Sequence, residues 1–468
     1  MSTQARFLTG SLMRHVTTMA LSSSVGLLSV FLVDFADLYF ISLLGQAELA
    51  AAVGFAGTVS FFVFSITIGL AIAIGALVAP RLGAGRRDEA REVATSVLLV
   101  GVAFSAGIAA VTVWQAAALV TLLGATGETH RLAVDYLHIV LPAIPLGALG
   151  IMCSSILRAH GDARRAMQVT LWAGGVNAVL DPLLIFGLGL GLDGAALATV
   201  AARAAMALAA VLAVQRHCGG FAVPRPARVV ADLAPMLAIA GPAVLTNVAT
   251  PIGNAVVTRF IAVHGDAAVA AYAVVGRLTP LVFCTLFAVS GAVGPIVGQN
   301  AGAERYDRVR EALVRSLQFV ALAVLAAWAF LLLARPWIVS GFGLDAQGAT
   351  IVFWFIVLAA PLFFFNGALF VANGAFNNLR RPLWATWLNW GRNTIGVLPF
   401  VWAGSTLGGA AGVLVGQALG GLVFGVLATW LSYRLVAGYA SGRLDATGHR
   451  LPALERARPD APFSSPRG

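Results

Sequence analysis

Two acidic residues lie three positions apart in the apolar stretch 26–41, at Asp34 and Asp37. An Asp near the centre of a bilayer-spanning helix costs about 2.5–3.5 kcal/mol, so such residues are rare and usually functional. Residues three apart share one face of a helix, so the two carboxylates project together. Their types and spacing indicate a site for a proton or a small cation.

A second polar face of the same kind lies in residues 176–182. Asn177 and Asp181 are four positions apart, and Pro182 removes a backbone hydrogen bond beside the carboxylate. Because burial disfavours a charged carboxylate, such a group can exchange a proton near neutral pH. Alternatively, carboxylate, amide and hydroxyl oxygens could coordinate Na⁺, with Thr199 as a further ligand. A structural alternative is that one Asp pairs with an Arg or caps a broken helix.

The elements that position these residues are membrane helices. The chain has 468 residues, of which 59% are hydrophobic and 11% charged, and its mean hydropathy is +0.88. A soluble domain of this length could not bury so much apolar surface. The net charge of +10 comes from Arg in short loops rather than from a basic face, which argues against nucleic-acid binding. No nucleophile, phosphate-loop or metal motif is present, so we expect no enzyme and no cofactor.

Twelve apolar stretches are long enough to cross a bilayer, at about 20 residues each. They lie at 15–43, 49–79, 92–120, 131–157, 165–188, 194–214, 234–262, 267–298, 312–334, 348–376, 382–403 and 408–434. Most Arg residues fall at the termini and in alternate loops, while Arg131 and Arg335 are the ones in the opposite loops. This asymmetry predicts that both termini are cytoplasmic. We expect a multi-pass protein of the bacterial inner membrane.

The sequence also repeats itself. Residues 39–51 (YFISLLGQAELAA) match 259–271 (RFIAVHGDAAVAA) at an offset of 220, and 81–88 (RLGAGRRD) match 300–307 (NAGAERYD) at 219. Six spans per copy place both copies in the same orientation, related by an axis along the membrane normal. The prediction is an all-α protein with two pseudo-symmetric six-helix lobes around a central cavity.

The Gly- and Pro-containing segment 219–228 divides these lobes. We expect a first lobe at 1–222, which carries the ion-coupling site, a second lobe at 223–437, and a disordered cytoplasmic tail at 438–468.

The second lobe differs in composition, because no Asp or Glu lies deep within its spans. Amides and aromatic residues occur there instead, a mixture that suits a pocket for flat, partly apolar cations. The candidates for a substrate cavity are Asn247, Asn254, Asn366, Asn373, Trp387, Trp390 and Asn393. For each aromatic residue, helix packing or an interfacial position is the alternative. The Arg residues within spans are Arg203, Arg259, Arg277 and Arg392, for which snorkelling, carboxylate pairing and substrate selection all stay open.

Several segments together resemble the multidrug and toxic compound extrusion (MATE) family over nearly the whole chain. They are 37–45 (DLYFISLLG), 49–54 (LAAAVG), 194–199 (GAALAT), 298–303 (GQNAGA), 392–399 (RNTIGVLP) and the pair Asn177 and Asp181. The resemblance implies that Asp37, Asn177, Asp181 and Thr199 match the first-lobe cation or proton site of the DinF-like branch. It also implies export of organic cations in exchange for H⁺ or Na⁺ by rocking of the two lobes. One departure is Ser22, where many relatives carry a proline, although its repeat partner Pro242 retains one.

The sequence therefore predicts a monomeric secondary antiporter that exports amphipathic, cationic compounds in exchange for H⁺ or Na⁺, with Asp37, Asp181, Asn177, Thr199 and the extra Asp34 at the coupling site. One alternative is a flippase of lipid-linked oligosaccharides or polyisoprenoids, which would need a strongly cationic cavity. Another is an integral-membrane enzyme, which would need a polar catalytic constellation at one membrane face. H⁺ and Na⁺ remain equal candidates, since the same oxygens serve both.

Overall fold

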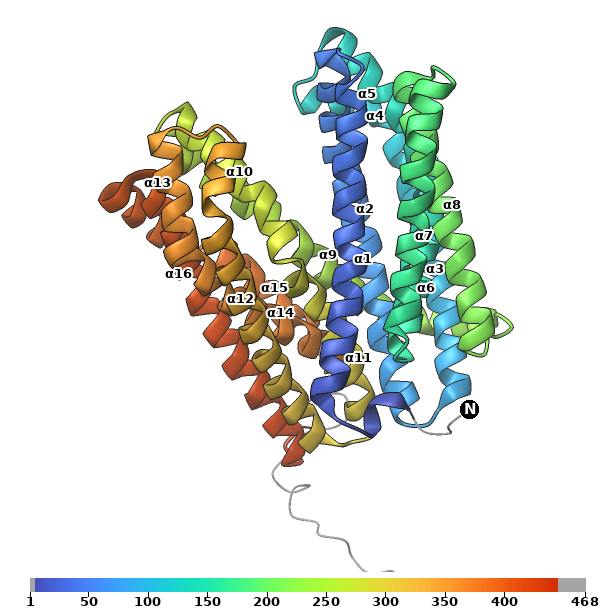
Figure 1. The fold of residues 1–468 in the computed structure, drawn as a ribbon. Coiled ribbons are helices and arrows are strands. Elements are labelled where there is room, and N and C mark those ends of the chain that lie inside the picture. Colours follow the sequence, from blue (N-terminus) through green and yellow to red (C-terminus); the bar gives the residue numbers. More distant parts are fainter. Residues whose placement is uncertain (1–4, 445–468) are drawn as a thin grey trace, which may run out of the picture.

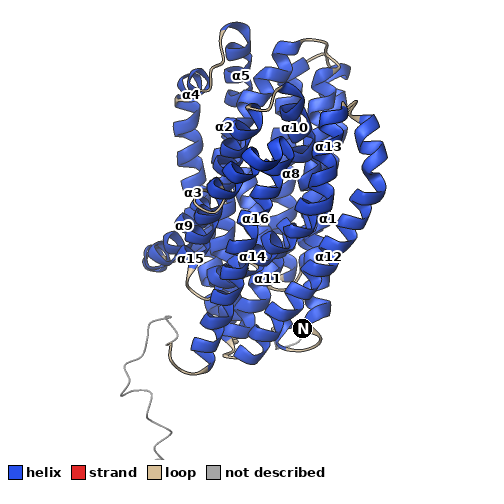
Figure 2. Cartoon of the chain, turned by 90° about the vertical axis from the view of Figure 1, so that its left-hand side faces the viewer, coloured by secondary structure: helices blue, strands red, loops and turns tan. Residues whose placement is uncertain are grey.

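The computed structural model describes residues 5–444, which lie almost entirely in helices joined by short loops (Figure 2). A helix satisfies its own backbone hydrogen bonds inside lipid, and the Ala and Leu abundant in this chain have high helix propensity. The first half contains α1 (Leu12–Ser42), α2 (Ala47–Gly83), α3 (Arg87–Trp114), α4 (Ala116–Leu122), α5 (Gly127–Val140), α6 (Ile144–Ala159), α7 (Ala163–Pro182) and α8 (Gly191–His217). The second half contains α9 (Pro226–Ala262), α10 (Asp266–Val282), α11 (Cys284–Gly302), α12 (Tyr306–Gly341), α13 (Ala346–Trp354), α14 (Ala360–Asn378), α15 (Pro382–Asn393) and α16 (Leu398–Ala440). Short 3₁₀ or π pieces are η1 (Arg6–Leu8), η2 (Leu141–Ala143), η3 (Leu183–Gly187) and η4 (Phe355–Ala359).

These helices make twelve membrane-spanning segments, as the sequence predicts. Within residues 5–444, ten stretches are each long and apolar enough to cross a bilayer, and α10 with α11 forms an eleventh span that bends by 42°. The last of the ten, Pro382–Ala440, has 59 residues. One crossing needs only about 20 residues, so this stretch contains two crossings.

The two crossings meet at a reversal inside α16. Gly409 has φ 58° and ψ −145°, a backbone conformation that is essentially restricted to glycine. The arms on either side pack through small residues: a Cβ on Gly404 would lie 2.1 Å from the carbonyl oxygen of Gly412, and a Cβ on Gly416 would lie 2.2 Å from that of Phe400. The result is an antiparallel helical hairpin, which separates the eleventh span from the twelfth.

The spans form two six-helix lobes, as the internal repeat predicts. In the first lobe α1 packs on α7 and α6 on α8, and in the second α11 packs on α14 and α14 on α16. The lobes contact each other through α2 with α9 and through α11 with α1 and α2. Figure 1 shows the two halves close together at the end that holds the N-terminus and apart at the opposite end, where α5 and α10 lie. We call these the terminal end and the far end.

A close crossing of α2 and α11 joins the lobes at the terminal end. A Cβ on Gly83 would lie 1.9 Å from the carbonyl oxygen of Gln299, and a Cβ on Gly302 would lie 1.9 Å from that of Pro80. Gly83 and Gly302 occupy equivalent positions of the repeat, at an offset of 219. Only glycine lets two backbones approach this closely. This contact, which we call the seam, is therefore built twice, once from each lobe.

The N-terminal segment packs against the seam. Phe7 in η1 is 1% exposed, and its backbone N–H donates to Gln299 Oε1 at 2.9 Å. Its carbonyl oxygen accepts a hydrogen bond from Asn300 Nδ2 at 3.2 Å. Gln299 Nε2 donates in turn to the carbonyl oxygen of Ala159, at the end of α6, at 2.7 Å. One buried side-chain amide thus connects the second lobe, the first lobe and the N-terminal segment.

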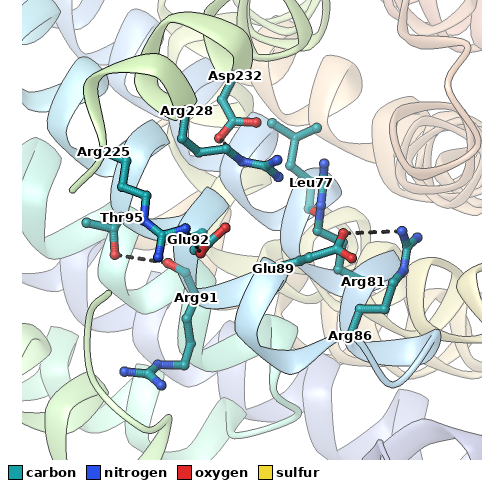
Figure 3. Close-up of polar contacts among 10 residues, drawn as sticks. All are labelled: Leu77, Arg81, Arg86, Glu89, Arg91, Glu92, Thr95, Arg225, Arg228 and Asp232. Carbon is teal, nitrogen blue, oxygen red and sulfur yellow. Dashed lines mark hydrogen bonds and ion pairs between the residues drawn. The ribbon is translucent and has the colours of Figure 1, made fainter. Parts of the chain in front are cut away.

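The linker between the halves is held against α3 at the same end. The backbone N–H of Ala222 donates to Thr95 Oγ1 at 3.0 Å. Figure 3 shows Arg225 next to Glu92, with 3.3 Å between guanidinium and carboxylate. At the other end of the chain, α16 continues to Ala440 and so includes the first three residues of the tail expected to start at 438. The remainder of that predicted tail, from residue 445, lies outside the described residues.

Candidate functional site

The polar face formed by Asn177 and Asp181 lies at a break in α7. The helix is capped at its start by Asp162, whose side chain accepts a hydrogen bond from the Arg165 backbone N–H at 3.2 Å. It ends at Pro182, and the chain continues as the π-helical turn Leu183–Gly187. Proline has no N–H to donate, which interrupts the α-helical pattern, and π turns occur frequently at functional sites. Asp181 directly precedes this break.

Asp37 of α1 and Asp181 of α7 form a carboxyl pair. Asp181 is fully buried and Asp37 is half-buried, and their carboxyl groups lie within hydrogen-bonding range of each other. Asp181 Oδ1 accepts a hydrogen bond from Asn177 Nδ2 at 3.2 Å. Asp181 Oδ2 and Asp37 Oδ1 are buried and have no hydrogen-bond partner in residues 5–444. Two carboxylates in contact repel each other strongly, so the pair favours a shared proton or a bound cation.

Two hydroxyl groups lie beside this pair. Thr199 of α8 donates from Oγ1 to the carbonyl oxygen of Ala195 at 3.1 Å, and its hydroxyl lies next to that of Tyr136 on α5. Tyr136 lies within electrostatic reach of both Asp37 and Asp181. Sequence reasoning missed Tyr136. A signal was available, since the repeat places Phe355, which has no hydroxyl, at the equivalent position of the second lobe.

Asp34 has a different environment from Asp37. Its side chain is exposed, and the positive charge of Arg203 on α8 acts on it electrostatically. Arg203 is held in place by a 2.6 Å hydrogen bond from Nη1 to the carbonyl oxygen of Val140. The same charge acts on Tyr136, but no cationic side chain in the described part of the chain contributes to the environment of Asp37. Asp34 thus has a compensating positive charge, whereas the Asp37–Asp181 pair lacks one.

The arrangement limits the chemistry of the site. It offers carboxyl, amide and hydroxyl oxygens from α1, α5, α7 and α8, which suit a proton or a hard cation such as Na⁺. Within the described residues, no group of three or more His, Cys, Asp or Glu side chains could hold a metal ion. Four of the five predicted coupling residues come together, namely Asp37, Asn177, Asp181 and Thr199. Asp34 lies on the same helix beside them, next to Arg203.

The seven predicted substrate residues are spread through the second lobe. Asn373 and Asn393 are buried: Asn389 Nδ2 donates to Asn373 Oδ1 at 3.1 Å, and Asn393 Nδ2 donates to the Asn389 carbonyl oxygen at 2.8 Å. Asn366 Oδ1 accepts a hydrogen bond from Arg392 Nη1 at 2.6 Å. These asparagines link α14 to α15.

The other four predicted substrate residues lie on α9 and α15. Asn247 donates to the carbonyl oxygen of Ala243 at 2.9 Å, and Asn254 is exposed on the same helix. Trp390 Nε1 donates to the Leu245 carbonyl oxygen at 3.0 Å, while Trp387 is 73% exposed. A hollow of about 410 Å³ near the far end of α9 is lined by Arg259, Phe260, Ala262 and Val263, and so by none of the seven.

Comparison with known proteins agrees with this architecture. The MatE family model matches residues 23–183 and again 242–402, one match in each lobe. The FAD transporter of Shewanella oneidensis is 28% identical over 431 residues, which cover 90% of this chain and 94% of that protein. The multidrug export protein MepA of Staphylococcus haemolyticus is 24% identical over 429 residues, covering 91% of this chain and 94% of its own.

Solved structures show the same fold. The Vibrio cholerae MATE transporter VcmN in its bent form matches with a TM-score of 0.86 and 25% identity, covering 91% of this chain and 97% of that one. An outward-facing multidrug resistance MATE family transporter matches with a TM-score of 0.87 and 21% identity, covering 94% of this chain and 99% of that one. Since the family model matches both lobes and most of the chain, this protein belongs to the MatE family of multidrug and toxic compound extrusion transporters.

Proposed function

We propose that this transporter is a secondary antiporter that exchanges organic compounds for H⁺ or Na⁺ at the Asp37–Asp181 pair. MATE transporters use coupling ions and need no cofactor, and they move compounds rather than convert them. The observation that supports the site is the contact of two carboxyl groups, each with a buried oxygen that has no hydrogen-bond partner in residues 5–444. A proton or cation between them removes the repulsion and satisfies both oxygens.

Ion binding at this pair would connect α1 to α7 within the first lobe, beside Thr199 on α8. A bound ion shifts a conformational equilibrium only if its affinity differs between the two states. In our proposal, the Asp37–Asp181 contact changes as the lobes rock, so the ion favours one arrangement. The lobes would comprise residues 1–222 and 223–437. We place both termini in the cytoplasm, on the basis of the Arg distribution, and the chain in the bacterial inner membrane.

The substrates are proposed from the composition of the second lobe and from the relatives. The relatives include a FAD transporter and a multidrug export protein, both of which carry names that indicate organic compounds. We therefore favour flat, aromatic organic molecules over lipid-linked oligosaccharides.

The test is transport by purified protein in proteoliposomes, with a pH gradient or a Na⁺ gradient imposed one at a time. Ethidium and FAD serve as fluorescent test compounds. We expect gradient-driven transport by the wild type, and its loss in Asp37→Asn and Asp181→Asn. Asp193→Asn is the matched control, because Asp193 is an exposed carboxylate in the first turn of α8. If both pair variants transport as fast as Asp193→Asn at equal protein, the assignment of the pair is wrong.

A further inference from the structure

The two lobes differ in the charged side chains that lie within their spans. The acidic residues Asp34, Asp37 and Asp181 lie within the spans of the first lobe. In the second lobe, Arg259, Arg277 and Arg392 lie within spans, whereas all acidic residues between 226 and 440 are at or near helix ends. These acidic residues are Asp232, Asp266, Glu304, Asp307, Glu311 and Asp345. Of these arginines, Arg392 is only partly exposed and lies inside the membrane without a nearby carboxylate.

Arg392 shows this imbalance most clearly. It lies in the last turn of α15, is only partly exposed, and its Nη1 donates to Asn366 Oδ1 on α14 at 2.6 Å. Its Nε is buried and has no hydrogen-bond partner in residues 5–444. No charged side chain in that range acts on the guanidinium. Since Arg is always charged, burying it beside a single neutral amide is costly unless an anion also binds.

The geometry of the guanidinium defines what kind of anion would fit. Nη1 is the amino group on the Cδ side, so its bond to Asn366 leaves the opposite edge, which carries Nε and Nη2. The N–H groups of that edge point in parallel and match the two oxygens of a carboxylate or a phosphate. A Lys at this position would carry the same charge but could not form the paired bonds.

The backbone around Arg392 is fixed independently of its guanidinium. Phe424 of α16 packs over both Gly391 and Gly396, where a Cβ would lie 2.4 Å from its ring atoms. The Asn393 amide on the next residue donates to the Asn389 carbonyl oxygen at 2.8 Å. This end of α15 is therefore held by packing and by a neighbouring amide, so a purely structural role does not require a charge at position 392.

We propose that Arg392, oriented by Asn366, binds a carboxylate or phosphate group on the compounds that this protein transports. The inference rests on the proposed transport function and extends it to amphipathic anions and zwitterions, whereas the sequence alone suggests cations. The carboxyl pair of the first lobe takes the coupling ion, and Arg392 of the second lobe takes the acidic group of the substrate.

The experiment compares three flat aromatic compounds in proteoliposomes made of zwitterionic phosphatidylcholine, under the imposed gradient. The compounds are riboflavin 5′-phosphate, riboflavin without the phosphate, and the cation ethidium. The variants are Arg392→Gln, Arg392→Lys and Asn366→Asp, with Arg277→Gln as the matched control because Arg277 is exposed on α10. Asn366→Asp is nearly isosteric and gives Arg392 an internal carboxylate, which competes with an external anion while preserving the contact.

We expect the wild type to favour the phosphate ester over riboflavin. Arg392→Gln should weaken the apparent affinity for the ester by roughly 10- to 100-fold, the value of a charge-assisted bond, and leave ethidium unchanged. Arg392→Lys should be intermediate, and Asn366→Asp should lose the preference while unfolding at the wild-type temperature or above. Arg277→Gln should behave like the wild type.

Other outcomes would overturn the inference. A wild type that does not favour the ester, or an Asn366→Asp variant that keeps the preference, is incompatible with it. Native mass spectrometry after addition of anionic phosphatidylglycerol separates a lipid phosphate from a substrate phosphate. A lipid bound only when Arg392 is present, with unchanged substrate preference, would assign the site to lipid and refute the proposal. Failure of the antiport proposal itself looks different, because none of the three compounds would then move with either gradient.

Discussion

Gln299→Ala should open the terminal end of the protein. The Gln299 side chain is 1% exposed and makes two buried hydrogen bonds, from the Phe7 N–H at 2.9 Å and to the Ala159 carbonyl oxygen at 2.7 Å. These bonds join the second lobe to the N-terminal segment and to the first lobe. In an arrangement where the lobes separate at the terminal end, both bonds would be absent. The substitution therefore weakens the closed arrangement selectively.

The magnitude follows from the two bonds. Each is worth about 0.5–1.5 kcal/mol net, and each buried partner left without a bond costs about 1–3 kcal/mol. Partial access of water to the emptied position reduces the total, so we expect the closed arrangement to lose about 2–4 kcal/mol. A loss of 2 kcal/mol alone raises the population of the open arrangement about 30-fold relative to the closed one.

Thiol labelling measures this population. Ala79 is fully buried beside the seam, where its Cβ lies 2.9 Å from the position of a Cβ on Gly298. A Cys at position 79, in a chain whose three native cysteines are replaced, should react with a membrane-impermeant thiol reagent only when the terminal end opens. We expect labelling of Ala79→Cys to be at least tenfold faster with Gln299→Ala, the factor for about 1.4 kcal/mol.

Gln347→Ala is the control, because the Gln347 amide makes one exposed hydrogen bond at the far end, to the His264 carbonyl oxygen at 3.2 Å. It should label at the wild-type rate. If Gln299→Ala also labels at that rate, and both proteins unfold at the same temperature, the idea that Gln299 holds the terminal end closed is refuted.

Three further predictions follow from the described geometry. Gly302→Val should prevent the close crossing of α2 and α11, because its Cβ would lie 1.9 Å from the Pro80 carbonyl oxygen. The thiol of Ala79→Cys should then be labelled rapidly, and an unchanged labelling rate would contradict this prediction. Gly409→Ala should destabilise the fold by about 1–3 kcal/mol, because φ is 58° at this position, and should lower the unfolding temperature in detergent. The neighbouring Gly408→Ala should have little effect, because a Cβ there meets no other atom. Equal stabilities of the two variants would refute the strain argument. Tyr136→Phe should slow ion-driven transport without abolishing it, because the hydroxyl next to Thr199 and the carboxyl pair is lost while the pair itself remains. A wild-type rate under both gradients would exclude Tyr136 from the site.

The sequence by itself determined the class of protein, the spans and the repeat. Hydropathy identifies a membrane helix because lipid requires a long apolar segment, and the repeat in 39–51 and 259–271 predicts two lobes. The spacing of Asn177 and Asp181 is equally local, since residues four apart on a helix share a face in any fold. Those two residues are hydrogen-bonded in the structure.

Only the tertiary structure decided which faces meet. Spacing along a helix says which residues point the same way, but it does not say which other helix they approach. The contact of Asp37 with Asp181, the charge of Arg203 beside Asp34, and the bond from Arg392 to Asn366 all join different helices. They depend on the packing of whole lobes, and that packing is set by many small apolar contacts that no short motif records.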